Sequence, residues 1–163
     1  MPDKKCSQRA LLHELQAFRG GVVDTSTLIY LERVGLLPQT ARWFSLLLIP
    51  QVVAEYGAQP GGTVQVAAVG SGTTDAVVCH TAQALGWPVL SEDKQVLRRA
   101  RTLNLCFYNT LMIVLALCAQ DRLTLAAFPG IRDRLCAFAR YSPAVVAVGD
   151  ALYRRLRQER TSG

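Results

Sequence analysis

The sequence has little charge, few aromatic side chains and no closely paired cysteines. Charged residues make up 18% of the 163 residues and aromatic residues 7%, while 50% of the chain is hydrophobic. This composition excludes an intrinsically disordered chain, which is highly charged and poor in apolar residues. The five cysteines include no CxxC pair and are odd in number, which argues against a disulfide framework and a zinc site. We interpret most of them as small core residues in a reducing compartment.

A long uninterrupted apolar segment is also missing. The longest apolar run covers residues 105–119 and contains Tyr108, Asn109 and Thr110. It is shorter than the roughly 18 residues that a membrane-spanning helix needs, so we expect a buried strand and a buried helix there. The stretch MPDKKCSQRALLHEL at the start contains no apolar segment typical of a secretory signal. The sequence therefore predicts a cytoplasmic protein with no membrane partner.

The chain does have the length and apolar content for one domain with a large core. A chain of this size buries about two-thirds of the surface that its unfolded form exposes. The net charge is +6 (18 basic minus 12 acidic residues) and the pI is about 9.4, which permits a polyanionic partner without showing one. We find no internal repeat and no low-complexity segment. Residues 1–163 are predicted to form a single domain, with a core at about 20–120 and a C-terminal helical extension at about 121–160.

Short apolar runs alternate with segments of helical periodicity. Continuous apolar runs such as Leu46–Ile49 are typical of buried parallel strands. Strands are expected at 21–24, 46–49, 63–69, 88–90 and 105–108, and helices at 7–18, 26–34, 38–44, 50–57, 74–85, 92–101, 109–119, 124–139 and 143–158. This alternation predicts an α/β fold with three α/β/α layers, a central mostly parallel sheet, and extra helices at both termini.

Two carboxylates follow expected strands. Asp24 comes directly after the run Val22-Val23, and Asp93 lies three residues after Leu90. In open parallel sheets, ligands bind beyond the carboxyl ends of the strands. We therefore expect Asp24 and Asp93 to share one edge of the sheet.

Two further acids are expected near the same edge. Glu55 lies one turn into the helix after the strand LLLIP, three residues after Val52, and so shares a helix face with an apolar position. Asp75 opens the helix TTDAVVCHTAQAL on the same side as Val78. Clustered carboxylates on a core-facing stripe are costly unless a cation offsets their charge. Oxygen ligands of this kind suit Mg²⁺ or Mn²⁺.

Each acid also has a purely structural interpretation. Asp24 can cap the following helix, Glu55 can be a solvated helix acid, and Asp75 can favour the dipole of its helix. Asp93 can likewise be a first-turn acid, with Glu92 as its rival for any role in a site. The set as a whole favours the functional interpretation, because each acid follows a strand or begins a helix at one edge.

Together, VVDTSTLIYLERVG, IPQVVAEYG and TTDAVVCHTAQALGWPVLSEDKQVLRRA resemble the PIN domain (PilT N-terminal type) family over roughly residues 20–120. The family pattern has a strand ending in Asp followed by small hydroxyl residues, then three further acids in order. Matched residue by residue, the pattern's acids are Asp24, Glu55, Asp75 and Asp93, and its hydroxyl positions are Thr25 and Ser26. The chain departs from the common toxins of the family by a helix before the first strand and two added helices at the end.

The resemblance implies a metal-dependent endoribonuclease, a hydrolase that cleaves single-stranded or unpaired RNA. Many members of the family are the toxin of a toxin–antitoxin pair and many dimerise, so an antitoxin protein and a homodimer are implied partners. Asp24, Asp75 and Asp93 would hold Mg²⁺ or Mn²⁺ with Glu55 assisting, and hydrolysis would leave a 5′-phosphate and a 3′-hydroxyl. The supporting hydrogen-bonding residues would be Thr25, Ser26, Ser91 and Asn109, although Asn109 also fits a helix N-cap.

Basic residues offer RNA contacts. Arg98, Arg99 and Arg101 follow Asp93 on one expected helix and could contact the RNA backbone, or could form a solvated face. We interpret the basic C-terminal stretch RRLRQER as a solvated terminal helix.

Other α/β families fit less well. A phosphatase of the haloacid-dehalogenase type needs Asp-x-Asp after its first strand, where this chain has Ser26 at the second acidic position. A dinucleotide-binding domain needs GxGxxG in the turn that Asp24-Thr25-Ser26 occupies. The alternative that stays open is a catalytically inactive PIN-like scaffold that binds a protein or RNA partner.

Overall fold

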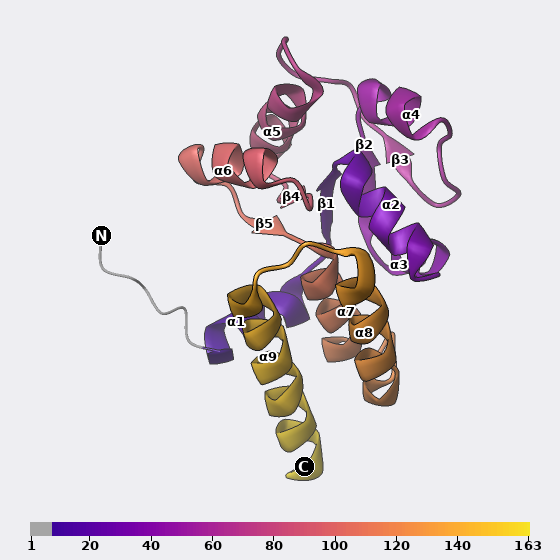
Figure 1. Ribbon diagram of the computed structural model, residues 1–163. Helices are drawn as coiled ribbons and strands as arrows, with labels where there is room; N and C mark the ends of the chain where they lie inside the picture. Colours follow the sequence, from indigo (N-terminus) through magenta and orange to yellow (C-terminus); the bar gives the residue numbers. More distant parts are fainter. Residues whose placement is uncertain (1–7) are drawn as a thin grey trace. The chain divides into compact units, whose positions relative to one another are not determined.

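The computed structural model describes residues 8–163, which form two compact units (Figure 1). Arg19–Thr110 form the first, here called the α/β unit. Leu111–Gly163 and the described residues up to Phe18 form the second, here called the helical unit. The division falls at Thr110, ten residues before the expected end of the core; the expectation of one domain over 1–163 stays a prediction. No helix within residues 8–163 is both long and apolar enough to cross a membrane.

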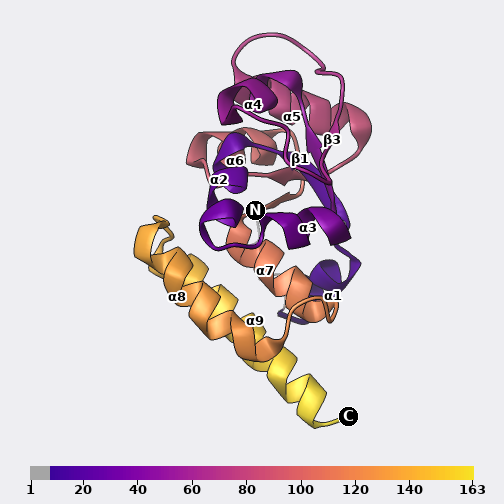
Figure 2. The same cartoon turned by 90° about the vertical axis from the view of Figure 1, so that its right-hand side faces the viewer.

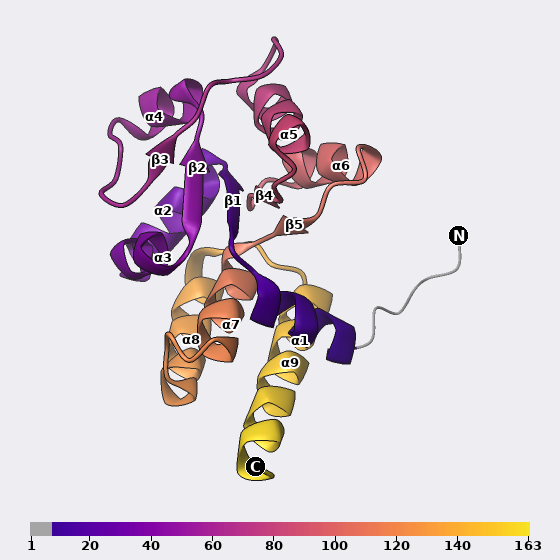
Figure 3. The ribbon, with the colours of Figure 1, turned by 180° about the vertical axis from the view of Figure 1, so that it is seen from behind.

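The α/β unit is built on a five-stranded, wholly parallel sheet (Figure 3). Its strand order is β3-β2-β1-β4-β5. The strands are β1 (Gly20–Val23), β2 (Ser45–Leu48), β3 (Val64–Gln65), β4 (Val89–Leu90) and β5 (Phe107–Tyr108). Val22 pairs with Leu47 on one side and with Val89 on the other, so β1 is the central strand.

Helices cover this sheet in two groups. One consists of α2 (Thr25–Arg33), α3 (Leu37–Trp43) and α4 (Pro50–Tyr56), where α2 contacts α3 and α4, and α3 contacts β2. The other consists of α5 (Thr74–Leu85) and α6 (Lys94–Thr102), which contact each other and β1, β4 and β5. Right-handed crossovers put the two groups on opposite faces, because the chain moves outward from β1 in opposite directions in its two halves. The predicted three-layer α/β/α fold is confirmed.

Two glycines begin the central strand because no side chain fits there. A Cβ at Gly21 would lie 2.5 Å from the carbonyl oxygen of Pro88, next to β4. A Cβ at Gly20 would collide with the carbonyl of Ser45 on β2, and its φ of +127° is one that side-chain-bearing residues rarely adopt. The same glycines that break the preceding helix in the sequence therefore let β1 approach both neighbours closely.

The helical unit contains both of the predicted terminal extensions (Figure 2). It holds α1 (Gln8–Ala17), α7 (Thr110–Ala119) from its second residue onward, a 3₁₀ turn (Leu125–Ala127), α8 (Phe128–Phe138) and α9 (Pro143–Thr161). α1 packs on α9, and the side-chain amide of Gln120 donates hydrogen bonds to the carbonyls of Leu15 (2.9 Å) and Phe18 (2.8 Å) at the end of α1. The apolar helix α7 is buried, as expected for a helix without a polar face.

Several predicted elements were wrong in extent, two of them by four residues or more. The strand expected at 63–69 pairs only over Val64–Gln65, because its partner β2 ends at Leu48, just before Pro50. The helix expected at 124–139 is α-helical only from Phe128, because Pro129 lacks a backbone N–H and fits only the first turn. The cysteines are also less uniform than expected: Cys79 and Cys118 are buried, Cys106 is exposed, and Cys6 lies outside the described residues.

Candidate functional site

The centre of the carboxyl edge lies between β1 and β4. The chain passes from β1 to β2 and β3 on one side, and returns to place β4 and β5 on the other. Ligands of open parallel sheets bind at such a reversal of strand order. Asp24 follows β1 at this point and Ser91 follows β4, and the N–H of Asp24 continues the pairing by donating to the carbonyl of Leu90 (2.8 Å).

Asp24 is buried with only 6% of its surface exposed. It occupies the N-cap position of α2, yet its side chain makes no capping hydrogen bond. Its Oδ2 instead accepts hydrogen bonds from the hydroxyls of Ser91 (2.9 Å) and Ser26 (3.1 Å). The carboxylate is thus oriented by two side chains at the edge of the sheet and not by the helix that it precedes.

Each of these serines also accepts a hydrogen bond from the loop after β4. The N–H of Glu92 donates to Ser26 Oγ and the N–H of Asp93 donates to Ser91 Oγ, both at 3.0 Å. Each hydroxyl therefore accepts from a loop amide and donates its proton to the same oxygen of Asp24. We give the name serine relay to this network, which consists of Asp24, Ser26, Ser91 and the backbone N–H groups of Glu92 and Asp93. It fixes the rotamer of Asp24 through contacts from two separate chain segments.

Neighbouring acids influence the ionisation of Asp24 and Asp75. Burial raises the pKa of Asp24, hydrogen bonds from Ser91, Ser26 and the Thr25 backbone lower it, and the charge of Asp75 raises it further. The pKa of Asp75 is raised by burial first and then by the charges of Asp93 and Glu55, while Arg99 lowers it. Asp75 therefore lies within electrostatic reach of Asp24, Glu55 and Asp93, although the four acids come from separate segments.

Two of the acids also make local hydrogen bonds. Asp93 caps α6, where its Oδ1 accepts from the backbone N–H groups of Gln95 (2.7 Å) and Val96 (3.4 Å). Glu55 Oε2 accepts from the hydroxyl of Thr25 at 2.8 Å, which links α4 to the start of α2. The expectation that Glu55 shares the buried face of Val52 was wrong, because Val52 is fully buried and Glu55 is exposed.

Glu92 has a structural role that the sequence did not reveal. Its Oε2 accepts from the hydroxyl of Thr27 on α2 (2.7 Å), and its Oε1 accepts from the backbone N–H of Thr110, the first residue of α7 (2.8 Å). A carboxylate at a helix N-terminus is favourable because the first N–H groups have no partner within the helix. The two neighbouring acids thus make different contacts: Glu92 links α2 to the start of α7, and Asp93 caps α6.

The remaining predicted residues are Asn109 and three arginines of α6. Asn109 is the single residue between β5 and α7. Arg98, Arg99 and Arg101 are exposed on α6; Arg99 is in electrostatic reach of Asp75, whereas Arg101 lies over the ring of Phe107 with its guanidinium carbon 5.6 Å from the centroid. Thr27 was not predicted as a site residue; its only signal in the sequence is its place in the hydroxyl run after Asp24.

The donor set fits a hydrated divalent cation in its chemistry. All four acids offer oxygen ligands, which Mg²⁺ and Mn²⁺ prefer. The pKa values of Asp24 and Asp75 are raised by burial first and also by neighbouring carboxylates, and a cation would favour the ionised form of both groups. Within residues 8–163, no group of three or more His, Cys, Asp or Glu side chains is close enough to hold a metal ion. Mg²⁺ commonly keeps several waters and uses one or two carboxylates, so the two observations are compatible.

The chain was also compared with protein families, with curated proteins and with solved structures. None of the three comparisons found a match to this chain. The functional interpretation therefore depends on the geometry of the carboxyl edge and on the motif resemblance.

Proposed function

We propose that this protein is a Mg²⁺- or Mn²⁺-dependent ribonuclease acting on single-stranded or unpaired RNA. The proposal is supported above all by the electrostatic reach of Asp75 to Asp24, Glu55 and Asp93, near the reversal of strand order. Glu55 lies next to the last residue of α4, so the capping of helix starts does not explain its electrostatic influence on Asp75. The same proposal includes the role of a toxin, an antitoxin partner, a homodimer and a cytoplasmic location. These four points are supported only by the PIN resemblance and the composition.

The acids would divide the binding of the ion and the chemistry between them. A bound divalent ion supplies charge neutralisation at the phosphate and a water of lowered pKa. The serine relay holds Asp24 Oδ2, so that this carboxylate keeps one orientation during turnover. Asp93 is held at the same edge by its own cap bonds. Asp75 lies within electrostatic reach of the other three acids, where it would help to hold the ion.

Neighbouring side chains would position the RNA. Thr25 orients Glu55 through its hydroxyl, and Arg99 lies near Asp75, where it can contact a phosphate. Arg98 and Arg101 are exposed on the same helix as further candidates for the backbone. Hydrolysis adds water to the phosphorus and breaks the bond to the 3′-oxygen, leaving a 5′-phosphate and a 3′-hydroxyl.

The second candidate is a PIN-like scaffold that binds a partner without turnover. One observation favours it: no group of three candidate ligands within residues 8–163 is close enough to enclose an ion. The two functions differ in metal affinity, because a pure binding scaffold has no use for the cation.

The two candidates are separated by titrating Mn²⁺ into the wild type and into Asp24→Asn/Asp93→Asn, and by following cleavage of a fluorescent single-stranded RNA in the same samples. Both asparagines keep an acceptor oxygen for the bonds described above, so the fold should be retained, which circular dichroism verifies. The matched control is Glu14→Gln/Glu32→Gln, which removes the same charge at exposed positions.

A nuclease requires metal-dependent cleavage that the control keeps and the Asp24→Asn/Asp93→Asn variant loses. Equal cleavage by all three proteins would refute these residues as the site. Absence of both Mn²⁺ binding and cleavage in the wild type would establish the scaffold.

A further inference from the structure

The positive charge of the protein is concentrated in the helical unit. Its described residues, 8–18 and 111–163, contain nine arginines, no lysine and five acids, a difference of +4. The α/β unit contains seven basic and six acidic residues, a difference of +1. The candidate site thus lies in the nearly neutral unit, and an attraction for polyanions belongs to the other unit.

The second half of α9 presents arginines to solvent. Arg154 and Arg157 are exposed and lie three residues apart, so they share one helix face. Neither forms an ion pair with an acid within residues 8–163. In contrast, Arg155 pairs with Glu159 (3.4 Å). The charges of Arg154 and Arg157 are therefore available to a ligand.

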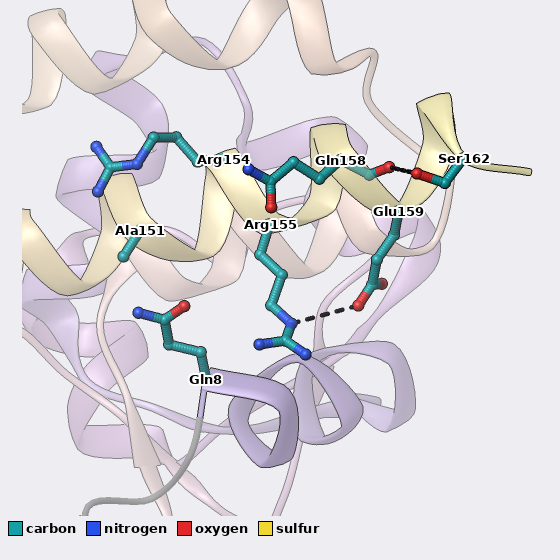
Figure 4. Close-up of a pocket in the computed structure, with 7 residues that line it drawn as sticks. All are labelled: Gln8, Ala151, Arg154, Arg155, Gln158, Glu159 and Ser162. Carbon is teal, nitrogen blue, oxygen red and sulfur yellow. Dashed lines mark hydrogen bonds and ion pairs between the residues drawn. The ribbon is translucent and has the colours of Figure 1, made fainter.

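Two hollows flank this face and share Arg154. The first, of about 470 Å³, lies between α1 and α9. Figure 4 shows Arg154 and Arg155 diverging from α9 there, with Gln8 of α1 opposite. The second, of about 250 Å³, lies between α8 and α9 and is lined by Phe128, Pro129 and Tyr153. Arg154 thus lines a mainly polar hollow on one side and a hollow with aromatic residues on the other.

The aromatic hollow is suited to a flat ligand. Tyr153 stacks on the buried Phe128 with ring centroids 4.7 Å apart, and Arg157 lies over the Tyr153 ring at 5.8 Å from its centroid. The nearby acids do not oppose an anion strongly, because Arg132 binds Asp150 through two hydrogen bonds (3.0 and 2.8 Å) and also pairs with Asp133. Guanidinium planes and aromatic rings are the usual stacking partners of unpaired bases.

We propose that Tyr153, Arg154, Arg155, Arg157 and Gln158 form a binding surface for single-stranded RNA, here called the α9 surface. Arg154 and Arg157 contact phosphates, and a base stacks on the guanidinium of Arg157, which Tyr153 supports from below. Proteins that bind single strands combine basic grooves and aromatic platforms in this way. The sequence favours a solvated terminal helix. That interpretation does not explain why Arg154 lines two hollows or why Tyr153 stacks on Phe128.

The choice of RNA rests on the proposed function, whereas the location rests on charge, hollows and stacking. An acidic protein would be attracted by the same net charge. The observations favour a nucleic acid because the basic residues of the unit are all arginines and one of them lies on an aromatic ring. Phosphates accept the planar fork of arginine, and bases can stack on it.

The test is the affinity of the intact protein for a short fluorescein-labelled oligouridylate, measured by anisotropy in EDTA so that no metal-dependent cleavage occurs. Arg154→Gln/Arg157→Gln is compared with the matched control Arg33→Gln/Arg42→Gln, which removes the same charge from exposed positions of the α/β unit. We expect the first variant to bind about tenfold more weakly, and the slope of log affinity against log salt to fall by about 1.4 for two lost phosphate contacts. The control should change neither value by a comparable amount.

Three results would overturn the proposal: no binding by the wild type, equal losses in both variants, or a polyglutamate peptide that competes as well as the oligouridylate. The last would assign the surface to an acidic protein. Failure of the nuclease proposal is recognised separately, because binding in EDTA does not depend on Asp24. A protein that binds oligouridylate through α9 and cleaves nothing would refute the nuclease and keep the α9 surface.

Discussion

Asp24 shows how a buried carboxylate can be oriented and still be costly. Two serine hydroxyls donate to its Oδ2, which favours the charged form, but burial is the largest influence and raises the pKa. Above its ordinary pKa of 3.8, the carboxyl group therefore opposes folding. A residue kept at such a position is typical of functional sites, where stability is sacrificed for chemistry.

The first prediction is that Asp24→Asn stabilises the metal-free protein at pH 7. The pKa of Asp24 is raised above its ordinary value of 3.8, so between pH 3.8 and the folded-state pKa the folded state holds a proton that the unfolded state has released. The free energy of unfolding thus falls as pH rises from 3.8 through the folded-state pKa. We expect a higher Tm for the variant at pH 7 in EDTA, and a difference that disappears below pH 3.8.

The matched control for this prediction is Asp121→Asn, at an exposed acid that pairs with Arg160 at 2.7 Å. It should not gain stability at pH 7, because no burial opposes its charge. A lower Tm of Asp24→Asn than of the wild type at pH 7 would show that the serine relay outweighs the cost of burial.

The second prediction concerns the cysteines. Burial raises the pKa values of Cys79 and Cys118 to about 11, so these thiols are protonated as well as shielded. Iodoacetamide at about pH 8 should modify the exposed Cys106 before Cys79 and Cys118, because the thiolate is the reacting form and needs access. Peptide mass mapping scores each cysteine separately. Modification of Cys79 at the rate of Cys106 without denaturant would contradict the burial of α5.

At the scale of elements, strand β1 depends on its glycines. The third prediction is that Gly21→Ala destabilises the protein by more than about 1–3 kcal/mol, the usual cost of overpacking, because its Cβ meets the backbone of Pro88. Gly130→Ala in α8 is the matched control, since its Cβ would meet nothing within 4 Å. It should gain up to about 0.5–1 kcal/mol from helix propensity. The two variants are compared by their urea unfolding midpoints. Equal midpoints would contradict the close approach of β1 and β4.

Elements of the fold were predictable where one segment determines its own structure. The continuous run before Asp24 and the glycine that ends α5 placed a strand and a helix correctly. The extent of β3 was not predictable, because it depends on where its partner β2 ends. Alternation over 63–69 describes the segment itself and carries no information about that partner.

The residues of the candidate site were also predictable only in part. The acids at strand ends were predictable because parallel strands bring their carboxyl ends together. The role of Glu92 was not, because it requires the register of β4 against β1 to bring the loop beside Thr27 and Thr110. Whether the acids bind a metal stays a prediction for the experiment on Asp24 and Asp93.

At the scale of the whole molecule, charge and candidate chemistry belong to different units. The fourth prediction is that the oligouridylate raises the Tm of the wild type in EDTA, because a ligand that binds only the folded state stabilises it by mass action. At 100 times the dissociation constant the gain is about 2.7 kcal/mol. Arg154→Gln/Arg157→Gln should show a much smaller shift and Arg33→Gln/Arg42→Gln an unchanged one. Equal shifts in all three proteins would place the binding elsewhere.

The helical unit is assembled from the two ends of the described chain, and α1 packs on α9. During synthesis, α1 leaves the ribosome long before its partner exists. At about 5–20 residues per second, the interval between them is on the order of ten seconds. The α/β unit is continuous in sequence and can fold within that time. The α9 surface can therefore form only after α9 has been made. In a nascent chain, the four acids at the carboxyl edge of the sheet can thus be folded before the proposed RNA-binding surface exists.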